Sequence, residues 1–288
     1  MRRAGRIAAL TGAAAAAFAA GEVYRYIFCR NSGIIGRLHE PRGHKEDYYL
    51  HRDGDAERLR RCRCIRLELT NDRGDTLEGY YYPCSGAPCG RIAFIVHGYR
   101  SEHLETAGMY YDYYKSRGFD LFTCDLTAAG ESGGRRYGYD IFESRDVKLW
   151  LDVLLKRFGA DIQIILHGFS MGGATVLKVS DSCPEQVKFI VSDSGFTSGA
   201  DILRGRIGAA YPLFRLMNRV ISGYDMDDTS GARTSRCCSS TGRRTGRCRF
   251  TWARSCTSSA RRRRTACSSP ARGTWRACMS TPRAMRRS

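Results

Sequence analysis

The segment that most constrains the fold of this chain surrounds Ser170. The apolar run Ile162–Leu166 is followed by His167-Gly168-Phe169-Ser170-Met171-Gly172-Gly173, and then by residues with helical spacing. A strand that turns sharply into a helix needs small residues on both sides of the turn, because the strained backbone leaves no room for side chains there. The pattern therefore predicts a strand, a tight elbow that presents the oxygen of Ser170 at a sheet edge, and a helix that begins directly afterwards.

A second Gly-x-Ser-x-Gly pattern, Gly130–Gly134, centres on Ser132. It also follows an expected strand, but the polar residues Arg135–Gly138 come after it in place of a helix. We therefore interpret Ser170 as a nucleophile position and Ser132 as part of a loop.

Most of the net positive charge of the chain lies in its last 60 residues. The net charge is +18, and Thr229–Ser288 contains 16 arginines and no lysine, aspartate or glutamate, which leaves +2 for the first 228 residues. A nucleic-acid-binding tail built on Arg261–Arg264, with Trp252 and Trp275 nearby, is the alternative from another functional class. It lacks lysines and the pattern of any binding fold, so we expect no nucleic-acid partner.

The 13 cysteines do not predict a disulfide framework or a metal centre. Seven of them precede residue 229, and an odd number excludes complete pairing among them. Cys84 and Cys89 could close a short loop in an oxidising compartment. The Cys62-x-Cys64 pair alone is too little for a metal site, so we expect neither a metal nor a cofactor.

The N-terminus has the character of a targeting segment. Basic residues among Met1–Arg6 precede the apolar, alanine-rich run Ile7–Ala20. We expect residues 1–28 to be a signal anchor, or a signal peptide cleaved near Ala17–Ala19, with the positive end in the cytoplasm and the domain outside the cell membrane or secreted. A packed helix is the alternative.

Strand-like and helix-like segments alternate along the rest of the chain. The hairpin turn Asn71–Asp75 joins two alternating strands, and short continuous apolar runs then alternate with helical spacing. This order predicts an α/β fold with a doubly wound, mainly parallel sheet that starts with an antiparallel hairpin. The expected strands are 64–70, 76–82, 92–96, 119–124, 162–166 and 187–191, and the expected helices are 105–117, 139–158 and 171–179.

Several motifs resemble the α/β-hydrolase fold. His97–Ser101 resembles its oxyanion loop, and Asp125–Gly133 resembles its Asp-x-Arg-Gly-x-Gly-x-Ser loop, from which Thr127 and Ala128 depart. Asp193–Ser198 resembles the segment after the strand that follows the elbow. The chain is most similar to bacterial hydrolases, often membrane-anchored, that are related to serine aminopeptidases and prolyl-oligopeptidase-like esterases.

The resemblance covers residues 60–228 and implies a site. Ser170 would attack the substrate, and the backbone N–H groups of Tyr99 and Met171 would form the oxyanion hole. The substrate would be a small ester or peptide-like molecule, and no cofactor would be needed. Residues 200–225 would form a cap that lines an acyl pocket; surface helices packed on the sheet are equally compatible with their spacing.

The second half of a catalytic triad is missing from the sequence. The fold requires the order serine, acid, histidine, and no histidine follows His167. We expect His97 to shape its loop and His167 to be structural. Asp193 could serve as the acid, but a structural cap is the simpler interpretation, and an acid without a base changes little.

The C-terminal sequence is explained by a shift of reading frame between about Asp228 and Arg233. With free choice of degenerate bases, one offset turns Arg236–Ser240 into Val-Leu-Leu-Phe, a buried strand. The same offset turns Ser240–Phe250 into His-Gly-Glu-Glu-Asp-Arg-Ala-Val-Pro-Phe, an acid loop, and Pro270–Thr274 into Gly-Ala-Gly-His, a histidine loop.

The sequence therefore predicts an incomplete α/β-hydrolase domain whose C-terminal part is lost, followed by a disordered Arg- and Ser-rich tail at 229–288 without strand pattern. By lineage the chain is a serine hydrolase that acts through an acyl-enzyme at Ser170. As written, it is expected to be catalytically impaired. A noncatalytic, membrane-anchored protein with the hydrolase fold is the alternative.

Overall fold

A computed structural model describes residues 2–38, 46–84, 88–227 and 249–252. Every element named below belongs to the unit Met1–Ser255.

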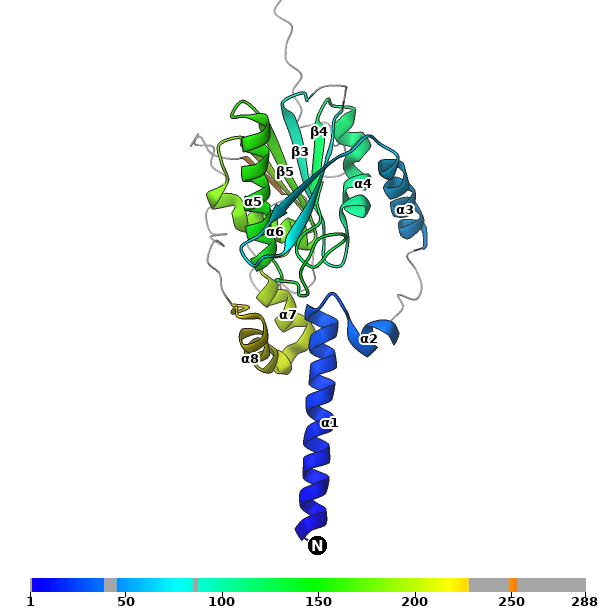
Figure 1. The fold of residues 1–288 in the computed structure, drawn as a ribbon, viewed down its shortest axis with the longest axis vertical. Coiled ribbons are helices and arrows are strands. Elements are labelled where there is room, and N and C mark those ends of the chain that lie inside the picture. Colours follow the sequence, from blue (N-terminus) through cyan, green and yellow to red (C-terminus); the bar gives the residue numbers. More distant parts are fainter. Residues whose placement is uncertain (1, 39–45, 85–87, 228–248, 253–288) are drawn as a thin grey trace, which may run out of the picture. The chain divides into compact units, whose positions relative to one another are not determined.

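The core is one mixed sheet with the strand order β1-β2-β4-β3-β5-β6-β7 (Figure 1). β1 pairs with β2, and β2 with β4, in antiparallel register. All later pairs, from β3–β4 to β6–β7, are parallel. This confirms the α/β fold with a mainly parallel sheet and an antiparallel start. The strands are β1 Ile65–Thr70, β2 Thr76–Tyr82, β3 Arg91–Val96, β4 Asp120–Cys124, β5 Gln163–Phe169, β6 Val187–Asp193 and β7 Arg249–Trp252.

Helices cover both faces of this sheet (Figure 1). On one face, α5 (Ile141–Phe158) and α6 (Met171–Val179) pack on a buried apolar cluster that includes Trp150 and Val176. On the other face, α4 (His103–Lys115) and α3 (Glu46–Arg60) pack on a second cluster, which includes Leu59. The central strands are buried on both sides, which explains their continuous apolar sequences.

Helix α3 is an element that the sequence interpretation left unassigned. Its contact with α4 is close, because a Cβ atom on Gly108 would lie 2.8 Å from the backbone carbon of Asp55. Leu59 is fully buried at the end of α3. The folded domain therefore begins before residue 60. The signal was weak because α3 is mostly polar and presents only a narrow apolar face.

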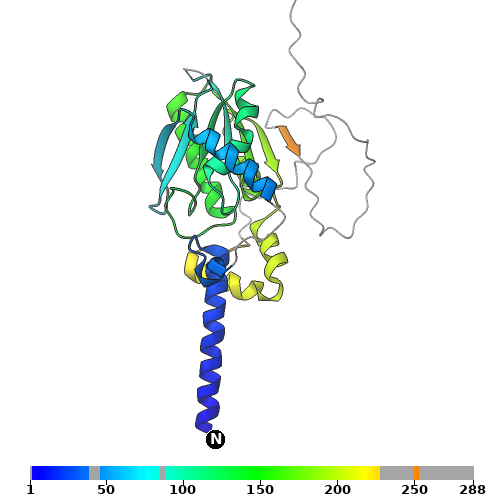
Figure 2. The ribbon, with the colours of Figure 1, turned by 90° about the vertical axis from the view of Figure 1, so that its right-hand side faces the viewer.

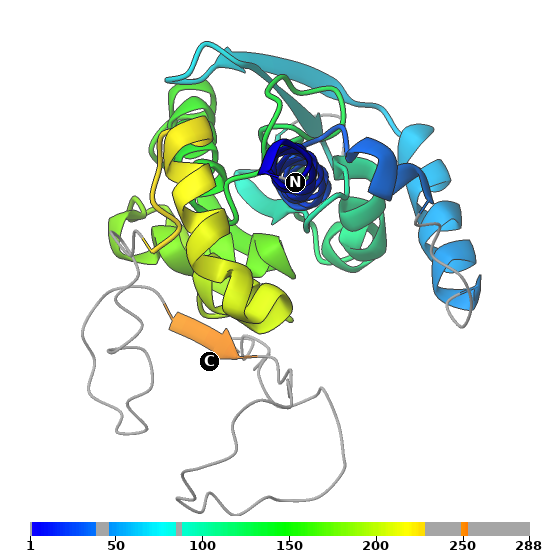
Figure 3. The same cartoon turned by 90° about the horizontal axis from the view of Figure 1, so that it is seen from below.

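A third apolar cluster joins the N-terminal helix to the segment expected to form the cap. The last turns of α1 (Arg2–Phe28) contribute Tyr24 and Phe28, and Tyr211 and Phe214 lie on α8 (Tyr211–Ser222). The segment expected to form the cap also contains α7 (Gly199–Ile207) and the 3-10 turn η2 (Gly208–Ala210). Figure 3 looks along α1 and shows α7 and α8 beside it. Residues of α7 and α8 therefore pack with the end of α1, and the cap stays a prediction.

The start of the chain is helical. α1 continues to Phe28, and the short helix α2 (Gly33–Leu38) follows. In the described part of the chain, no helix combines the length and the apolar character required to cross a membrane.

Strand β7 corrects one expectation about the C-terminal sequence. No strand was expected in 229–288, but Arg249–Trp252 pairs in parallel with Phe189–Ser192 of β6 (Figure 2). An open sheet edge offers unpaired N–H and C=O groups, and backbone pairing needs no particular side-chain pattern. A strand can therefore form where the apolar periodicity is absent. The rest of this tail lies outside the described residues. So do the predicted strand sequence Arg236–Ser240, the histidine-loop sequence Pro270–Thr274, and the acid-loop sequence Ser240–Phe250 apart from Arg249 and Phe250, which lie in β7.

Candidate active site

Ser170 occupies a strained turn between β5 and α6. Its backbone angles are φ 54° and ψ −114°, a combination that residues with a side chain rarely adopt. The side chain is half-buried, and the backbone N–H donates to the carbonyl oxygen of Asp193 over 2.8 Å. This is the elbow geometry that the sequence predicts.

Three glycines allow the chain to close around this turn. A Cβ atom on Gly168 would lie 2.0 Å from the carbonyl oxygen of Gly172, and one on Gly172 would lie 2.2 Å from that of Val96. A Cβ atom on Gly98 would lie 3.3 Å from Cβ of Ser170. The end of β3, the elbow and the start of α6 are therefore in backbone contact, which no larger residues would permit.

The two residues predicted to supply the oxyanion hole flank Ser170 from different elements. Met171 is the first residue of α6, so its N–H lies at the positive end of a helix. Tyr99 follows Gly98 in the loop after β3, and its phenol donates to the carbonyl oxygen of Ile27 over 2.7 Å. The Tyr99 side chain is thus engaged with α1, and the role of its backbone N–H in the oxyanion hole stays a prediction.

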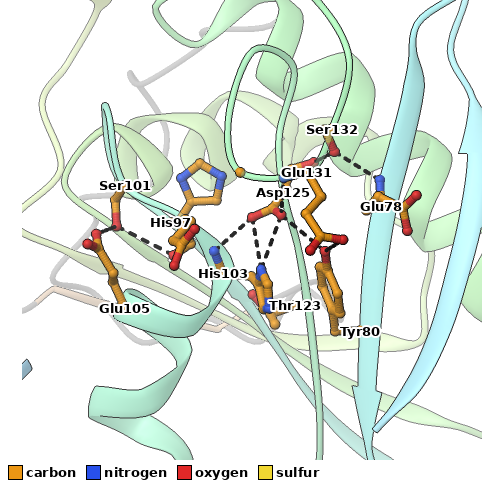
Figure 4. A network of polar contacts seen from close by, with 12 residues as sticks. Glu78, Tyr80, His97, Ser101, His103, Glu105, Thr123, Asp125, Glu131 and Ser132 are labelled. Atoms are coloured by element: carbon orange, nitrogen blue, oxygen red, sulfur yellow. Dashed lines mark hydrogen bonds and ion pairs between the residues drawn. The ribbon is translucent and has the colours of Figure 1, made fainter. Parts of the chain in front are cut away.

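The second Gly-x-Ser-x-Gly pattern is a structural loop. Ser132 is buried and accepts from the backbone N–H of Glu78 over 2.8 Å, while its hydroxyl donates to the carbonyl oxygen of Asp125 over 2.5 Å (Figure 4). These bonds attach the loop to β2. Ser132 is therefore unavailable as a nucleophile, as the sequence interpretation held.

Asp125, at the end of β4, organises the surrounding polar network (Figure 4). Its carboxylate accepts from the backbone N–H of His103 and of Glu131, at 2.8 and 2.9 Å, and contacts the imidazole Nδ1 of His103 at 3.1 Å. Burial alone would raise the pKa of Asp125, but the hydrogen bond and the charge of His103 outweigh burial and lower it to about 2. The loop after β4 and the start of α4 are thereby tied to one buried carboxylate.

Thr127 and Ala128, the two residues that differ from the family's loop motif, each have a distinct structural setting. Ala128 adopts φ 67°, the left-handed conformation for which the usual glycine is suited. At Thr127, where the family carries arginine, the hydroxyl accepts from Arg73 of the β1–β2 hairpin over 2.6 Å. Arg73 also lies 3.3 Å from the buried carboxylate of Asp146 on α5. Arg73, 54 residues before Thr127 in the sequence, therefore provides the guanidinium group that binds this loop.

None of the three histidines whose side chains are described is bonded to Ser170. In His97, Nδ1 lies 2.8 Å from the carbonyl oxygen of Gly98, and Nε2 accepts from the N–H of Leu126 over 3.0 Å. His167 contacts the hydroxyl of Tyr114 through Nδ1, and burial lowers its pKa to about 4. Within the described chain, no hydrogen bond to Oγ of Ser170 is present. His97 thus shapes its loop and His167 is structural, as expected.

The carboxylate of Asp193 is engaged in structural contacts. Oδ2 accepts from the hydroxyl of Tyr110 on α4 over 2.7 Å, and Oδ1 accepts from Ser194 over 3.0 Å. These bonds support the structural interpretation of Asp193. The sequence analysis missed Tyr110 and Arg73, and nothing in their neighbourhood identifies them, because each reaches the site only through the folding of distant segments.

One group of potential metal ligands lies away from the elbow. The ligand atoms of Cys84, Cys89 and Asp120 are all within 4.8 Å of one another. Asp120 accepts from the backbone N–H groups of both cysteines over 2.8 Å, so it already serves as the anchor of their loop. Asp120 begins β4, whereas Ser170 follows the end of the parallel strand β5. Cys84, Cys89 and Asp120 therefore lie at the amino ends of the parallel strands, and Ser170 lies at their carboxyl ends.

The chain is similar to known proteins in sequence and in structure. Residues 87–239 match the family described as serine aminopeptidase, S33. The uncharacterized protein YqkD of Bacillus subtilis is 26% identical over 141 residues, which span 49% of this chain and 45% of that protein. An esterase of Pyrococcus furiosus is 20% identical with a TM-score of 0.46, covering 62% of this chain and 69% of that structure. An alpha-beta hydrolase of Vibrio vulnificus is 20% identical with a TM-score of 0.46, and the match covers 68% of this chain and 66% of that structure.

Proposed function

Because the chain belongs to the serine aminopeptidase S33 family of the α/β-hydrolase superfamily, we propose that it is by lineage a serine hydrolase of ester or amide bonds. The observation that carries this proposal is the strained conformation of Ser170 at the junction of β5 and α6. Around it the backbone approaches so closely at Gly168 and Gly172 that only glycine fits there. A strained residue of this kind is costly and persists where the surrounding fold holds it in place.

The proposed reaction follows from these groups. Oγ of Ser170 attacks the carbonyl carbon of the substrate while a base takes its proton, and the oxyanion forms beside the N–H groups of Tyr99 and Met171. The bond to the leaving alcohol or amine then breaks, and the leaving group takes up the proton. Water hydrolyses the resulting acyl-enzyme by the same sequence of transfers.

We propose that the chain as written carries out this reaction poorly. Its described residues supply no hydrogen-bonded base for Ser170, and no histidine follows His167 in the sequence. The shifted reading frame of the segment after about Asp228 would restore an acid loop and a histidine loop in the order that the fold requires.

The exposure of Phe189 supports the loss of C-terminal structure. This residue lies on β6, inside the seven-stranded sheet, yet 42% of its surface is exposed. Its register partner Ile165 on β5 is only partly buried against the α4 side of the sheet. A large apolar side chain on an inner strand is normally covered by another layer.

The test compares two versions of the gene that differ by a single base near codons 228–233. The frame-restored protein should be labelled at Ser170 by a fluorophosphonate probe and should hydrolyse short p-nitrophenyl esters. The chain as written should do so about 10³-fold or more slowly, since a site without its base keeps only the contribution of the oxyanion hole and binding.

Two variants of the frame-restored protein serve as controls. Ser170→Ala should abolish labelling and turnover, whereas Ser132→Ala, at the second copy of the motif, should keep both if circular dichroism shows a folded protein. Equal labelling of the Ser170→Ala variant would refute the assignment of the nucleophile. If neither version of the gene yields Ser170-dependent turnover, the noncatalytic alternative holds.

A further inference from the structure

The exposed apolar side chains of this protein are concentrated on three helices. Of the eleven large apolar side chains that are exposed in the described chain, nine belong to α1, α2 and α8. The body of the sheet domain contributes only Tyr113 and Phe189. The nine residues are Ile7, Leu10, Phe18, Ile34, Leu38, Leu213, Leu216, Val220 and Ile221.

On α8 these side chains form a stripe. Leu213, Leu216 and Val220 follow one another at intervals of three and four residues, and Ile221 adjoins them, so they share one face of the helix. The opposite face packs into the third apolar cluster through residues such as Tyr211 and Phe214. A surface helix usually exposes its polar face, whereas α8 is apolar toward solvent as well, and Leu216 and Val220 are 60% and 77% exposed.

The position of α8 relative to α1 is fixed by direct bonds. The hydroxyl of Tyr24 on α1 donates to Oδ1 of Asn218 over 3.1 Å and lies 2.8 Å from Oγ of Ser222. Asn218 is fully buried, and Tyr24 is nearly so. Helix α8 therefore lies beside α1, which carries the alanine-rich, exposed N-terminal run, and the exposed stripe of α8 faces away from this contact.

The remainder of the chain is poorly suited to cover this stripe. Residues 228–288 contain no valine, isoleucine or leucine, and residues 228–248 also lack methionine and aromatic residues. Exposed arginines accompany the apolar residues: Arg37 lies on α2, and Arg219 on α8, where it is 3.8 Å from Asp225. Arg206, on the neighbouring helix α7, is exposed as well. Apolar side chains bordered by arginine are the composition of helices that lie in the interface of a membrane with anionic lipids.

We propose that α8 is a membrane-contact helix, whose Leu213–Ile221 stripe inserts among the acyl chains of an anionic bilayer while α1 contacts the same bilayer. This contact would orient the cap, and with it the approach to Ser170, toward the lipid surface. The inference does not depend on catalysis and can be tested on the chain as written.

The first test is sedimentation of the full chain with vesicles of phosphatidylcholine containing 30% phosphatidylglycerol. Leu216→Asp/Val220→Asp should lower the vesicle-bound partition coefficient by about tenfold or more, since two charges would have to enter an apolar layer. The single variants Val220→Asp and Tyr113→Asp form a matched pair with the same change of charge. Only the first should weaken binding, and both should keep the melting temperature of the parent.

The second test reports the location of α8 even if α1 dominates the affinity. Tryptophan is introduced by Val220→Trp or, as the control on α4, by Tyr113→Trp. With brominated phosphatidylcholine in the vesicles, fluorescence of Val220→Trp should shift to the blue and be quenched, while that of Tyr113→Trp should not. Equal responses of the two variants would overturn the proposal. So would conversion of a lipid-free dimer into a monomer by Leu216→Asp/Val220→Asp with unchanged vesicle binding, because the stripe would then be a contact between two copies of the chain.

Discussion

The backbone N–H of Ser170 donates a 2.8 Å hydrogen bond to the carbonyl oxygen of Asp193, so the elbow after β5 is tied to the end of β6. The carboxylate of the same Asp193 accepts the hydroxyl of Tyr110 from α4. The position of Ser170 is therefore set by three elements that are far apart in the sequence.

Tyr110→Phe should weaken this arrangement. The substitution removes the 2.7 Å bond to Oδ2 of Asp193 while keeping the ring, and a hydrogen bond to a charged group contributes about 1.5–3 kcal/mol. We expect a loss toward the lower end of that range in urea unfolding, because the carboxylate is only partly buried. Tyr113→Phe, on the exposed side of the same helix, is the control and should change stability by less than about 0.5 kcal/mol. Equal effects would show that the Tyr110–Asp193 bond does not stabilise the fold.

Gly172→Ala should prevent the elbow from closing. The added Cβ would lie 2.2 Å from the carbonyl oxygen of Val96 and 2.6 Å from that of His97, and both are backbone atoms of a buried strand end that cannot move aside. We expect loss of cooperative unfolding or a destabilisation of several kcal/mol. Gly205→Ala on α7 meets nothing within 4 Å and should stabilise the protein by about 0.5–1 kcal/mol. A well-folded Gly172→Ala protein would contradict the packing described.

Asp125→Asn should change the acid sensitivity of the protein. The pKa of Asp125 is lowered to about 2 in the folded state, below its value in the unfolded chain. Its charge therefore contributes stability above about pH 4, and this contribution is lost as the pH falls toward 2. The destabilisation caused by Asp125→Asn, measured in urea, should shrink by roughly 2 kcal/mol over that interval. The exposed Asp112→Asn is the control for loss of a charge, and a pH-independent effect of Asp125→Asn would refute the argument.

Glu143→Gln should act in the opposite pH range. Glu143 is fully buried at the start of α5 and accepts the backbone N–H groups of Gly138 and Asp140 at 2.8 and 2.9 Å. Burial raises its pKa to about 7, against the smaller effect of these bonds. The folded state then binds the proton more strongly, so the contribution of Glu143 is fully present below about pH 4 and is lost as the pH rises through 7.

Between pH 4 and 7, the parent protein should therefore lose up to roughly 3 kcal/mol of unfolding free energy relative to Glu143→Gln. Glu68→Gln, on the exposed side of β1, should run parallel to the parent. If the parent and Glu143→Gln keep a constant difference over this range, Glu143 titrates as an ordinary exposed carboxyl.

Much of the fold could be predicted from local sequence. The alternation in Ile65–Thr70, the continuous apolar run before His97 and the small residues around Ser170 each reflect a constraint that acts within a few residues. The elbow was identifiable because its strain excludes most side chains at neighbouring positions. Helix α3 was missed because its packing against Gly108 leaves only a narrow apolar signature.

Other features were decided by tertiary structure. Three hydrogen bonds join residues that are far apart in the sequence. Arg73 and Thr127 are 54 residues apart, Tyr110 and Asp193 are 83 apart, and Tyr24 and Asn218 are 194 apart. Strand β7 formed where no periodicity predicted it, because pairing with β6 satisfies backbone groups whatever the side chains are. The sequence by itself determined the order of elements and the strained serine, since these follow from steric and apolar patterns along the chain. Only the folded structure decided which polar groups meet, because a hydrogen bond depends on distance in space and leaves no periodic trace in the sequence.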